Sequence, residues 1–267
     1  MRMVVRGGAD LHTYGFAVIL LMVVNWGLEA WKWRLLVRDI ERLTMARAFT
    51  ATIAGTSIGM ITPNRVGEFA GRVLFLVPEN RITGAFATAV GSIAQFAVTL
   101  VMGCAGLVAV LLASDGAEVG PQAVAWITLC SIVAVCTLLL YFNPGLLRAV
   151  VARVPVVRRW AQQSDVLAQF TQAKLLVVLL LSAARYVVFT AQFVLLIRAV
   201  ADVGLVDAVL TVPIAFLFST LVPTLMLTEL GVRGSIAVAV ISSEGDTGQG
   251  VFLASTLLWL VNIAAPA

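Results

Sequence analysis

The sequence predicts an all-α integral membrane protein, a polytopic helical bundle, and three observations support this prediction. Hydrophobic residues make up 61% of the chain and charged residues only 12%, about half the charged share of a typical soluble domain. Several long stretches carry no charge at all, and roughly 20 apolar residues suffice to cross a bilayer. These stretches are Ile82–Ser114, Val119–Leu147, Ala208–Thr228 and Thr247–Ala267. Finally, the short alternating segments typical of a membrane β-barrel do not occur.

We expect five membrane spans. In chain order they cover about residues 15–37, 83–113, 122–142, 174–200 and 251–267. The first follows Arg2 and Arg6 as a signal peptide would, but no clear small-residue cleavage site follows it, so we interpret it as a retained span. The second would be roughly 45 Å long as a helix, against a hydrocarbon core of about 30 Å, and should therefore tilt or protrude.

A shorter apolar stretch lies between the first two spans and is interrupted. Residues 45–61 are rich in small side chains, break at Thr62-Pro63, and should resume as a helix over 64–78. Backbone that is not helical is tolerated at membrane depth only where protein or a wet cavity satisfies its polar groups. The break therefore indicates an internal cavity.

A matching interruption lies between the last two spans. Residues 207–222 are apolar, contain Pro213, and break near Pro223 ahead of a helix over 228–243. The connector 143–173 separates the two halves of the chain and should contain short amphipathic helices at the membrane interface.

The distribution of basic residues predicts the orientation of the chain. The connectors 38–47 and 143–173 are rich in arginine, whereas the loops 114–121 and 244–250 contain neither lysine nor arginine. Cytoplasmic loops carry the excess of basic residues, so the two connectors should lie in the cytoplasm and the two loops outside. This orientation places the N-terminus outside and the C-terminus inside.

Counting the crossings then predicts two hairpins that enter the membrane and return to the same side. Residues 48–80 must begin and end in the cytoplasm, and residues 207–245 must begin and end outside. The single transmembrane domain would thus hold two repeats of opposite orientation, about 15–113 and 174–267, joined by 122–173. Alternatively, the two interrupted stretches are ordinary short spans, which would change the number of crossings.

Both interruptions are followed by a glutamate and, four residues later, an arginine. These are Glu68 and Arg72 in the first and Glu229 and Arg233 in the second. Charge within a bilayer is costly and usually functional, although each pair could serve only to hold its hairpin together. The pairs could form locally, because residues four apart share a helix face, or they could cross between the hairpins. The sequence leaves both arrangements open.

The helix starts at the interruptions suggest an anion site. Thr62 resembles an N-cap with Pro63 at the first helical position, and Thr228-Glu229 also suits a helix N-terminus. Helix N-termini together with nearby arginines suit a phosphate group. Arg65 belongs to this set, or is simply an anchor at the membrane interface.

Arg185 lies near the middle of a predicted span and should face the interior of the bundle. It could pair with Glu29, Glu68 or Glu229, or it could bind a ligand. Glu29 lies among tryptophans and basic residues of an interfacial belt, where it could pair with Lys32. Four uncharged polar residues within spans are expected to join helices through hydrogen bonds. They are Asn25, Gln95, Gln192 and Asn262.

The sequence gives no positive sign of an enzyme, a metal site or a cofactor. The single histidine and three scattered cysteines form neither a nucleophile–base pair nor a ligand set. No phosphate-binding glycine-rich loop is present. The basic residues flank spans and form no patch interleaved with aromatic residues, so we expect no nucleic-acid partner.

The chain resembles the transmembrane region of the bacterial lysylphosphatidylglycerol synthase/flippase family over roughly residues 15–267. The residues that carry the resemblance are Pro63, Gly67-Glu68 and Arg72 early in the chain, and Pro223, Glu229-Leu230-Gly231-Val232-Arg233 and Trp259-Leu260-Val261-Asn262 with Pro266 late in it. The family's Pro-Gly-Gly-Leu-Gly run is missing from the late segment, and we expect no soluble aminoacyltransferase-like domain. The resemblance implies a multi-pass bacterial plasma-membrane protein that moves or handles a phospholipid or polyprenyl-linked amphiphile.

We therefore expect a flippase-like protein whose lipid partner is an anionic or aminoacylated phospholipid or a polyprenyl-phosphate species. Arg72, Arg233 and Arg185 would hold the phosphate, while Glu68 and Glu229 balance charge or bind a cation or proton. Two alternatives belong to other classes, namely the membrane module of a lipid-headgroup transferase and a non-transporting partner of a separately encoded synthase. A homodimer is a further partnership that we consider.

Overall fold

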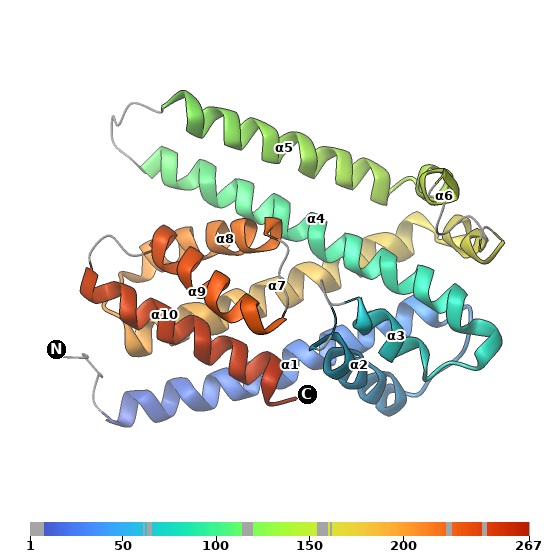
Figure 1. Ribbon diagram of the computed structural model, residues 1–267, viewed down its shortest axis with the longest axis horizontal. Helices are drawn as coiled ribbons and strands as arrows, with labels where there is room; N and C mark the ends of the chain where they lie inside the picture. Colours follow the sequence, from blue (N-terminus) through green and yellow to red (C-terminus); the bar gives the residue numbers. More distant parts are fainter. Residues whose placement is uncertain are drawn as a thin grey trace. The chain divides into compact units, whose positions relative to one another are not determined.

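The computed structural model describes residues 8–60, 62, 66–113, 120–153, 160, 162–222, 226–241 and 245–266, and these ranges contain helices and connections but no strand (Figure 1). The α-helices are α1 (Gly8–Val37), α2 (Met45–Met60), α3 (Gly67–Val73), α4 (Arg81–Ala113), α5 (Pro121–Tyr141), α6 (Pro144–Arg153), α7 (Gln172–Val200), α8 (Leu205–Leu221), α9 (Met226–Ile241) and α10 (Gly245–Trp259). Short 3₁₀ segments lie between α3 and α4 at Pro78–Asn80 and between α6 and α7 at Gln163–Gln169. After α10 the chain continues as a π-helix over Leu260–Ala264.

Within the described residues, five helices are long and apolar enough to cross a membrane. They are His12–Val37, Pro78–Ala113, Val124–Tyr141, Gln172–Val200 and Thr247–Ala264. They coincide with the five predicted spans, which confirms a polytopic helical membrane protein. The 33 residues of α4 correspond to about 50 Å of helix, which exceeds the thickness of a hydrocarbon core.

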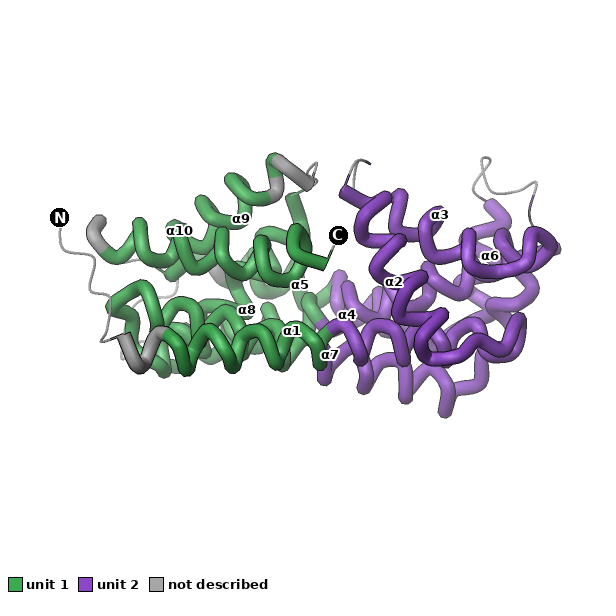
Figure 2. The backbone as a smooth tube through the Cα atoms, turned by 90° about the horizontal axis from the view of Figure 1, so that it is seen from below, with its two compact units in different colours: residues 1–25, 99–132, 186–267 green, residues 26–98, 133–185 purple. Residues whose placement is uncertain are grey.

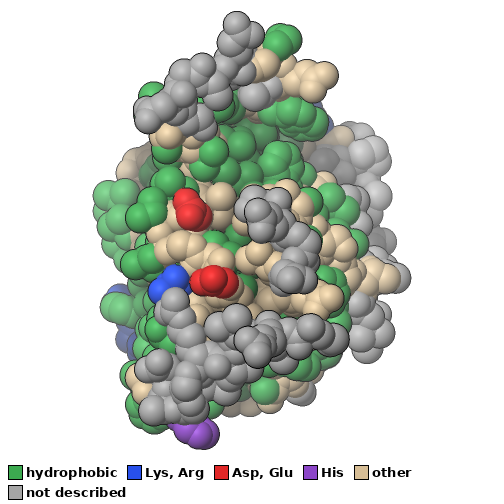
Figure 3. Space-filling view, turned by 90° about the vertical axis from the view of Figure 1, so that its left-hand side faces the viewer, with side chains coloured by type: hydrophobic (Ala, Val, Ile, Leu, Met, Phe, Trp, Pro, Cys, Tyr) green, Lys and Arg blue, Asp and Glu red, His purple; other side chains and the backbone are tan. Residues whose placement is uncertain are grey.

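The surface of α5 is that of a helix facing lipid. Leu129, Ile132, Val135 and Leu139 are each more than half exposed. Contiguous exposed apolar side chains are unfavourable in water but suit an acyl-chain environment. Figure 3 shows an end of the molecule where charged side chains are sparse among hydrophobic and uncharged ones in the described part of that face.

The chain divides into two compact units, coloured green and purple in Figure 2. Unit 1 comprises residues 1–25, 99–132 and 186–267, and unit 2 comprises residues 26–98 and 133–185. The four helices α1, α4, α5 and α7 each contribute one part to each unit. Unit 2 contains the α2–α3 interruption, and unit 1 contains the α8–α9 interruption.

The core of unit 2 is built around large buried side chains of α1, α5 and α7. Trp33 is fully buried, and its indole Nε1 donates a hydrogen bond of 3.0 Å to the Thr88 hydroxyl. The buried Tyr141 hydroxyl donates one of 2.7 Å to the carbonyl of Leu175. Their polar atoms are therefore satisfied without water, as buried tryptophan and tyrosine require.

Unit 1 is held together by aromatic packing and by hydrogen bonds between amide side chains and neighbouring helices. Phe193 of α7 stacks on Phe216 of α8, with ring centroids 5.6 Å apart. The Asn25 amide donates to the Asn262 side chain at 3.1 Å, and Gln192 donates to the carbonyl of Val18 at 2.9 Å. These contacts confirm that Asn25, Asn262 and Gln192 join helices.

The helix predicted over 64–78 is shorter in the structure. The first described helical residue after the interruption is Gly67, and α3 ends at Val73. The predicted helix start at Pro63 lies outside the described residues. Pro78 limits a helix on the C-terminal side, because the helical region is disfavoured for the residue before a proline. Val77 is accordingly extended, with φ −59° and ψ 148°.

Candidate functional site

The α2–α3 hairpin owes its close packing to glycines where the two helices meet. A Cβ atom on Gly71 would lie 2.6 Å from the Cα of Gly55 and 2.8 Å from the carbonyl oxygen of Ala54. A Cβ on Gly55 would lie 2.8 Å from Cγ of Arg72. Only glycine allows the two backbones to approach this closely, and the approach fixes where the Arg72 side chain can extend.

Thr62 links the end of α2 to the start of α3. Its hydroxyl accepts a hydrogen bond of 2.7 Å from the backbone N–H of Gly67, and it lies 3.2 Å from the carbonyl of Gly59, to which it donates. A hydroxyl on this residue thus satisfies one orphan donor at the start of a helix. Thr62 performs this role across a five-residue separation rather than from the adjacent N-cap position.

Arg72 extends from α3 to a carboxylate on α1. Its NH1 nitrogen lies 2.7 Å from Oε1 of Glu29, while its NH2 nitrogen lies 3.6 Å from Oε2 of Glu68. The local pair with Glu68 therefore exists, but the contact with Glu29 is the shorter one. The Nε atom of Arg72 is buried and has no hydrogen-bond partner among the described residues.

Glu29 is the centre of a buried ion cluster. Its Oε2 oxygen lies 2.7 Å from Nζ of Lys32 and 2.8 Å from NH1 of Arg185. Its Oε1 oxygen lies 2.7 Å from NH1 of Arg72. Glu29, Lys32 and Arg72 are each less than one-tenth exposed. We call the following set the Glu29 cluster: Glu29, Lys32, Glu68, Arg72 and Arg185.

The cluster has one side that is less enclosed. The side chains of Arg185 and Glu68 are 29% and 23% exposed, against 5% for Glu29. Arg185 NH1 also lies 3.5 Å from the Oε1 oxygen of Gln95. Arg185 is thus the cation through which a ligand could first contact the cluster.

Within the part of the chain that the structure describes, the cluster holds more cations than carboxylates. Among the described members, three cations face two carboxylates, and NH2 of Arg72 lies 3.6 Å from Oε2 of Glu68. Buried cations are costly unless they are paired and hydrogen-bonded. An excess of guanidinium groups together with an unsatisfied Arg72 Nε is an arrangement that can accept an anion with several oxygens.

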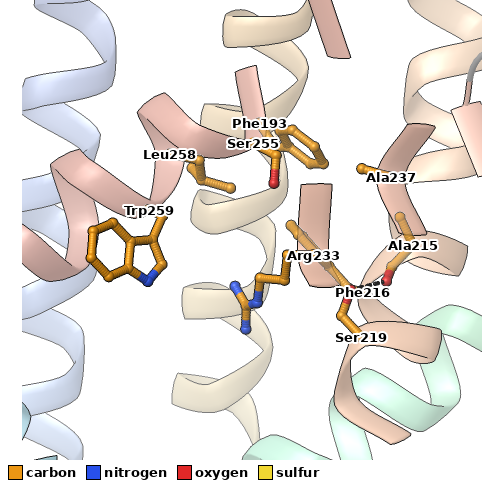
Figure 4. A pocket seen from close by; sticks show the side chains of 9 residues that line it. All are labelled: Phe193, Ala215, Phe216, Ser219, Arg233, Ala237, Ser255, Leu258 and Trp259. Carbon is orange, nitrogen blue, oxygen red and sulfur yellow. Dashed lines mark hydrogen bonds between the residues drawn. The ribbon is translucent and has the colours of Figure 1, made fainter. Parts of the chain in front are cut away.

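Arg233 of α9, in unit 1, borders a small cavity. Its guanidinium carbon lies 6.0 Å from the centre of the Phe189 ring. The cavity measures about 10 Å³, roughly the space of one water molecule, which is too small for a phosphate. Figure 4 shows the nine side chains that line it, from α7, α8, α9 and α10. They are Phe193, Ala215, Phe216, Ser219, Arg233, Ala237, Ser255, Leu258 and Trp259.

The remaining residues predicted for the site are only partly described. Arg65, Pro63 and Pro223 lie outside the described residues, as does the side chain of Glu229. Thr228 lies within the first turn of α9, which begins at Met226. The described residues contain no group of three or more His, Cys, Asp or Glu side chains that could hold a metal ion.

Sequence reasoning placed three members of the Glu29 cluster in the predicted site, namely Glu68, Arg72 and Arg185, but not its centre. Among the alternatives that it left open, the structure selects Glu29 as the partner of both Lys32 and Arg185. The contact between Glu29 and Arg72 was not anticipated. One signal was available, since Glu29 is a carboxylate within a span and such groups usually face the interior.

The comparisons with known proteins point to one family. The family described as "Lysylphosphatidylglycerol synthase TM region" matches residues 8–264 of the chain. No curated protein and no solved structure matches. The matched segment includes every residue of the Glu29 cluster.

Proposed function

Because the chain belongs to the lysylphosphatidylglycerol synthase TM region family, we propose that it is a flippase-like protein that translocates a phospholipid or polyprenyl-linked amphiphile. The Glu29 cluster holds the anionic headgroup, and the acyl chains stay in the lipid. The chain itself carries out no headgroup transfer. The membrane is the bacterial plasma membrane.

The single observation that carries this proposal is the convergence of two guanidinium groups on one buried carboxylate, together with the buried, unpartnered Nε of one of them. Arg72 and Arg185 both contact Glu29 at less than 3 Å, yet the Arg72 Nε atom remains without a partner among the described residues. A phosphate offers oxygens that can accept hydrogen bonds from Nε and from a guanidinium terminus together. Binding would replace an unsatisfied donor with a charge-assisted hydrogen bond, which favours the phosphate over an uncharged headgroup.

The movement of the headgroup follows from two opposed hairpins. In this proposal, α2–α3 enters from the cytoplasmic side and α8–α9 from the outside, as parts of an inverted repeat. Transporters of this design rock one part against the other around a central site. The presence of one interrupted stretch in each unit is what supports this arrangement.

The test is a headgroup-accessibility assay with the purified chain in proteoliposomes. Fluorescent phosphatidylglycerol would be placed in both leaflets, and the fraction reduced by an impermeant quencher would report translocation. Arg185→Gln removes one cation of the cluster and should slow translocation about tenfold or more, since a hydrogen bond to a charged group contributes about 1.5–3 kcal/mol.

The matched control is Arg148→Gln, which removes a half-exposed arginine of α6 that pairs with Asp165. It should translocate lipid at the rate of the unsubstituted chain. Equal rates for the Arg185 variant and the control would refute the proposed role of the cluster. An absence of translocation by the unsubstituted chain would favour a non-transporting partner of a synthase.

A further inference from the structure

An open groove lies in unit 2 between the end of α1 and the start of α7, and it shares no side chain with the Glu29 cluster. Its volume is about 630 Å³, within the range of small-molecule sites, roughly 300–1,000 Å³. The groove is lined by Leu35, Arg38, Asp39, Arg42, Ala173, Lys174 and Val177.

The groove lies at the membrane edge of two spans. The candidate span in α1 ends at Val37, and the one in α7 begins at Gln172. Lys174 joins the two ends, because its Nζ lies 2.8 Å from Oδ2 of Asp39 and 3.2 Å from the carbonyl of Leu36. Both sides of the groove therefore lie at the boundary between the hydrocarbon core and the headgroup region of the membrane.

The groove carries a positive charge. Arg38, Arg42 and Lys174 supply three cations, and Asp39 supplies one carboxylate. The hydrogen bond from Lys174 lowers the pKa of the Asp39 carboxyl below its usual value, so Asp39 is ionised at neutral pH. Two positive charges remain in excess. Arg38 and Arg42 are both exposed, and arginine can bind a phosphate through two parallel hydrogen bonds.

The side of the groove nearer the membrane is apolar. Leu35 lies three residues before Arg38, and Val177 lies three residues after Lys174, so both are about one helical turn further into their spans. Val177 is 43% exposed. A free anion would gain nothing from this apolar wall, whereas a lipid would place its acyl chains against it.

We propose that this groove binds an anionic phospholipid at the membrane interface. Arg38 and Arg42 hold the phosphate, and the acyl chains lie along Leu35 and Val177. Basic pockets between transmembrane helices recognise acidic lipid headgroups in this way. The lipid remains bound at the edge of unit 2 and is distinct from the amphiphile handled at the Glu29 cluster.

The experiment measures lipid retained by the purified full chain, by native mass spectrometry, during titration with phosphatidylglycerol or phosphatidylcholine. The chain should retain phosphatidylglycerol in preference to phosphatidylcholine. The double variant Arg38→Ala/Arg42→Ala should lose roughly tenfold in affinity for phosphatidylglycerol, because each basic residue near an acidic lipid contributes to the free energy of lipid binding. Both arginines are exposed, so the variant should elute from size exclusion as the unsubstituted chain does.

The matched control is Arg148→Ala/Arg153→Ala, which removes two exposed arginines of α6 in the same unit. It should retain phosphatidylglycerol unchanged. Equal losses in the groove variant and the α6 control would overturn the proposal, as would no loss in either. Displacement of the lipid by inorganic phosphate at equal concentration would assign the groove to a free anion and also overturn it.

As a second readout, phosphatidylglycerol with a photoreactive acyl chain would be cross-linked to the protein and the labelled peptides mapped. Labels should concentrate on residues 35–42 and 173–177. Labels spread evenly along the exposed apolar surface of α5 would indicate ordinary lipid contact and contradict a defined site.

Discussion

At the residue scale, the molecule depends on a single carboxylate that faces three cations. Glu29 is 43 residues from Arg72 and 156 from Arg185 along the chain. Its contact with Lys32, three residues away, follows from helix geometry. The contact with Arg72 could not be predicted from sequence, because Glu68 offers Arg72 a partner at ideal helical spacing and only the folded hairpin brings Arg72 nearer to Glu29.

Glu29→Gln is the substitution that tests this residue. It leaves Lys32, Arg72 and Arg185 without their shared counter-charge, and breaking a buried ion pair by removing one partner costs about 3–5 kcal/mol. We expect a marked fall in the midpoint of thermal unfolding in detergent. Glu79→Gln removes an exposed glutamate and should leave the midpoint unchanged. Similar midpoints for the two variants would mean that Glu29 does not hold the cluster together.

At the element scale, the approach of α3 to α2 depends on Gly71. In Gly71→Ala the new Cβ would meet backbone atoms of Gly55 and Ala54, which cannot rotate away. Overpacking of this kind costs about 1–3 kcal/mol, and it should also displace Arg72 from Glu29. The variant should therefore have a lower midpoint of thermal unfolding and a lower rate of lipid translocation.

The control for this substitution is Gly231→Ala in α9. Apart from its own turn of helix, no atom of the described residues lies within 4 Å of a Cβ built at this position. Alanine is favoured over glycine within a helix by about 1 kcal/mol. The control should unfold at the same temperature or higher. If Gly71→Ala behaved in the same way, the close approach of the two backbones would be unimportant for stability.

Thr62 provides a second test of the hairpin. Thr62→Val keeps the shape of the side chain but removes the acceptor for the Gly67 N–H. An unsatisfied donor that is partly buried costs about 1–3 kcal/mol, so the valine variant should be destabilised. Thr62→Ser restores the hydroxyl and should recover most of the loss in the same unfolding measurement. Failure of serine to rescue would assign the effect to packing of the methyl group.

The long elements were predictable, and the short one was not. The spans around α4 and α5 follow from uncharged runs, since only a membrane-spanning or deeply buried helix needs 20 or more apolar residues in succession. The limits of α3 depend on a hydroxyl that acts from five residues away and on the backbone restriction before Pro78. Such local geometry is not visible in hydropathy.

At the scale of the whole molecule, continuous helices run through units that are not continuous in sequence. Each of α1, α4, α5 and α7 belongs partly to unit 1 and partly to unit 2. Hydropathy predicts where such helices begin and end, but it does not predict which half of one helix packs with which half of another. For that reason the sequence predicted repeats in chain order and did not predict the two units.

The inverted repeat makes a prediction about sidedness. The hairpin interpretation requires that residues on either side of α2–α3 face the cytoplasm, whereas residues on either side of a complete span must face opposite compartments. Arg47 and Glu79 are exposed at the ends of the hairpin, and Gly120 and Asn143 are exposed at the ends of α5. Single cysteines at these four positions, in a chain without its native cysteines, would be treated with an impermeant maleimide in intact cells.

Arg47→Cys and Glu79→Cys should both react only after the membrane is permeabilised. Gly120→Cys should react in intact cells and Asn143→Cys only after permeabilisation, because α5 crosses completely and its basic end stays inside. The α5 pair thus calibrates the assay for a true crossing. Reaction of positions 47 and 79 from opposite sides would show that α2–α3 is an ordinary span, and two opposed hairpins could then no longer explain how a headgroup reaches the Glu29 cluster from either face of the membrane.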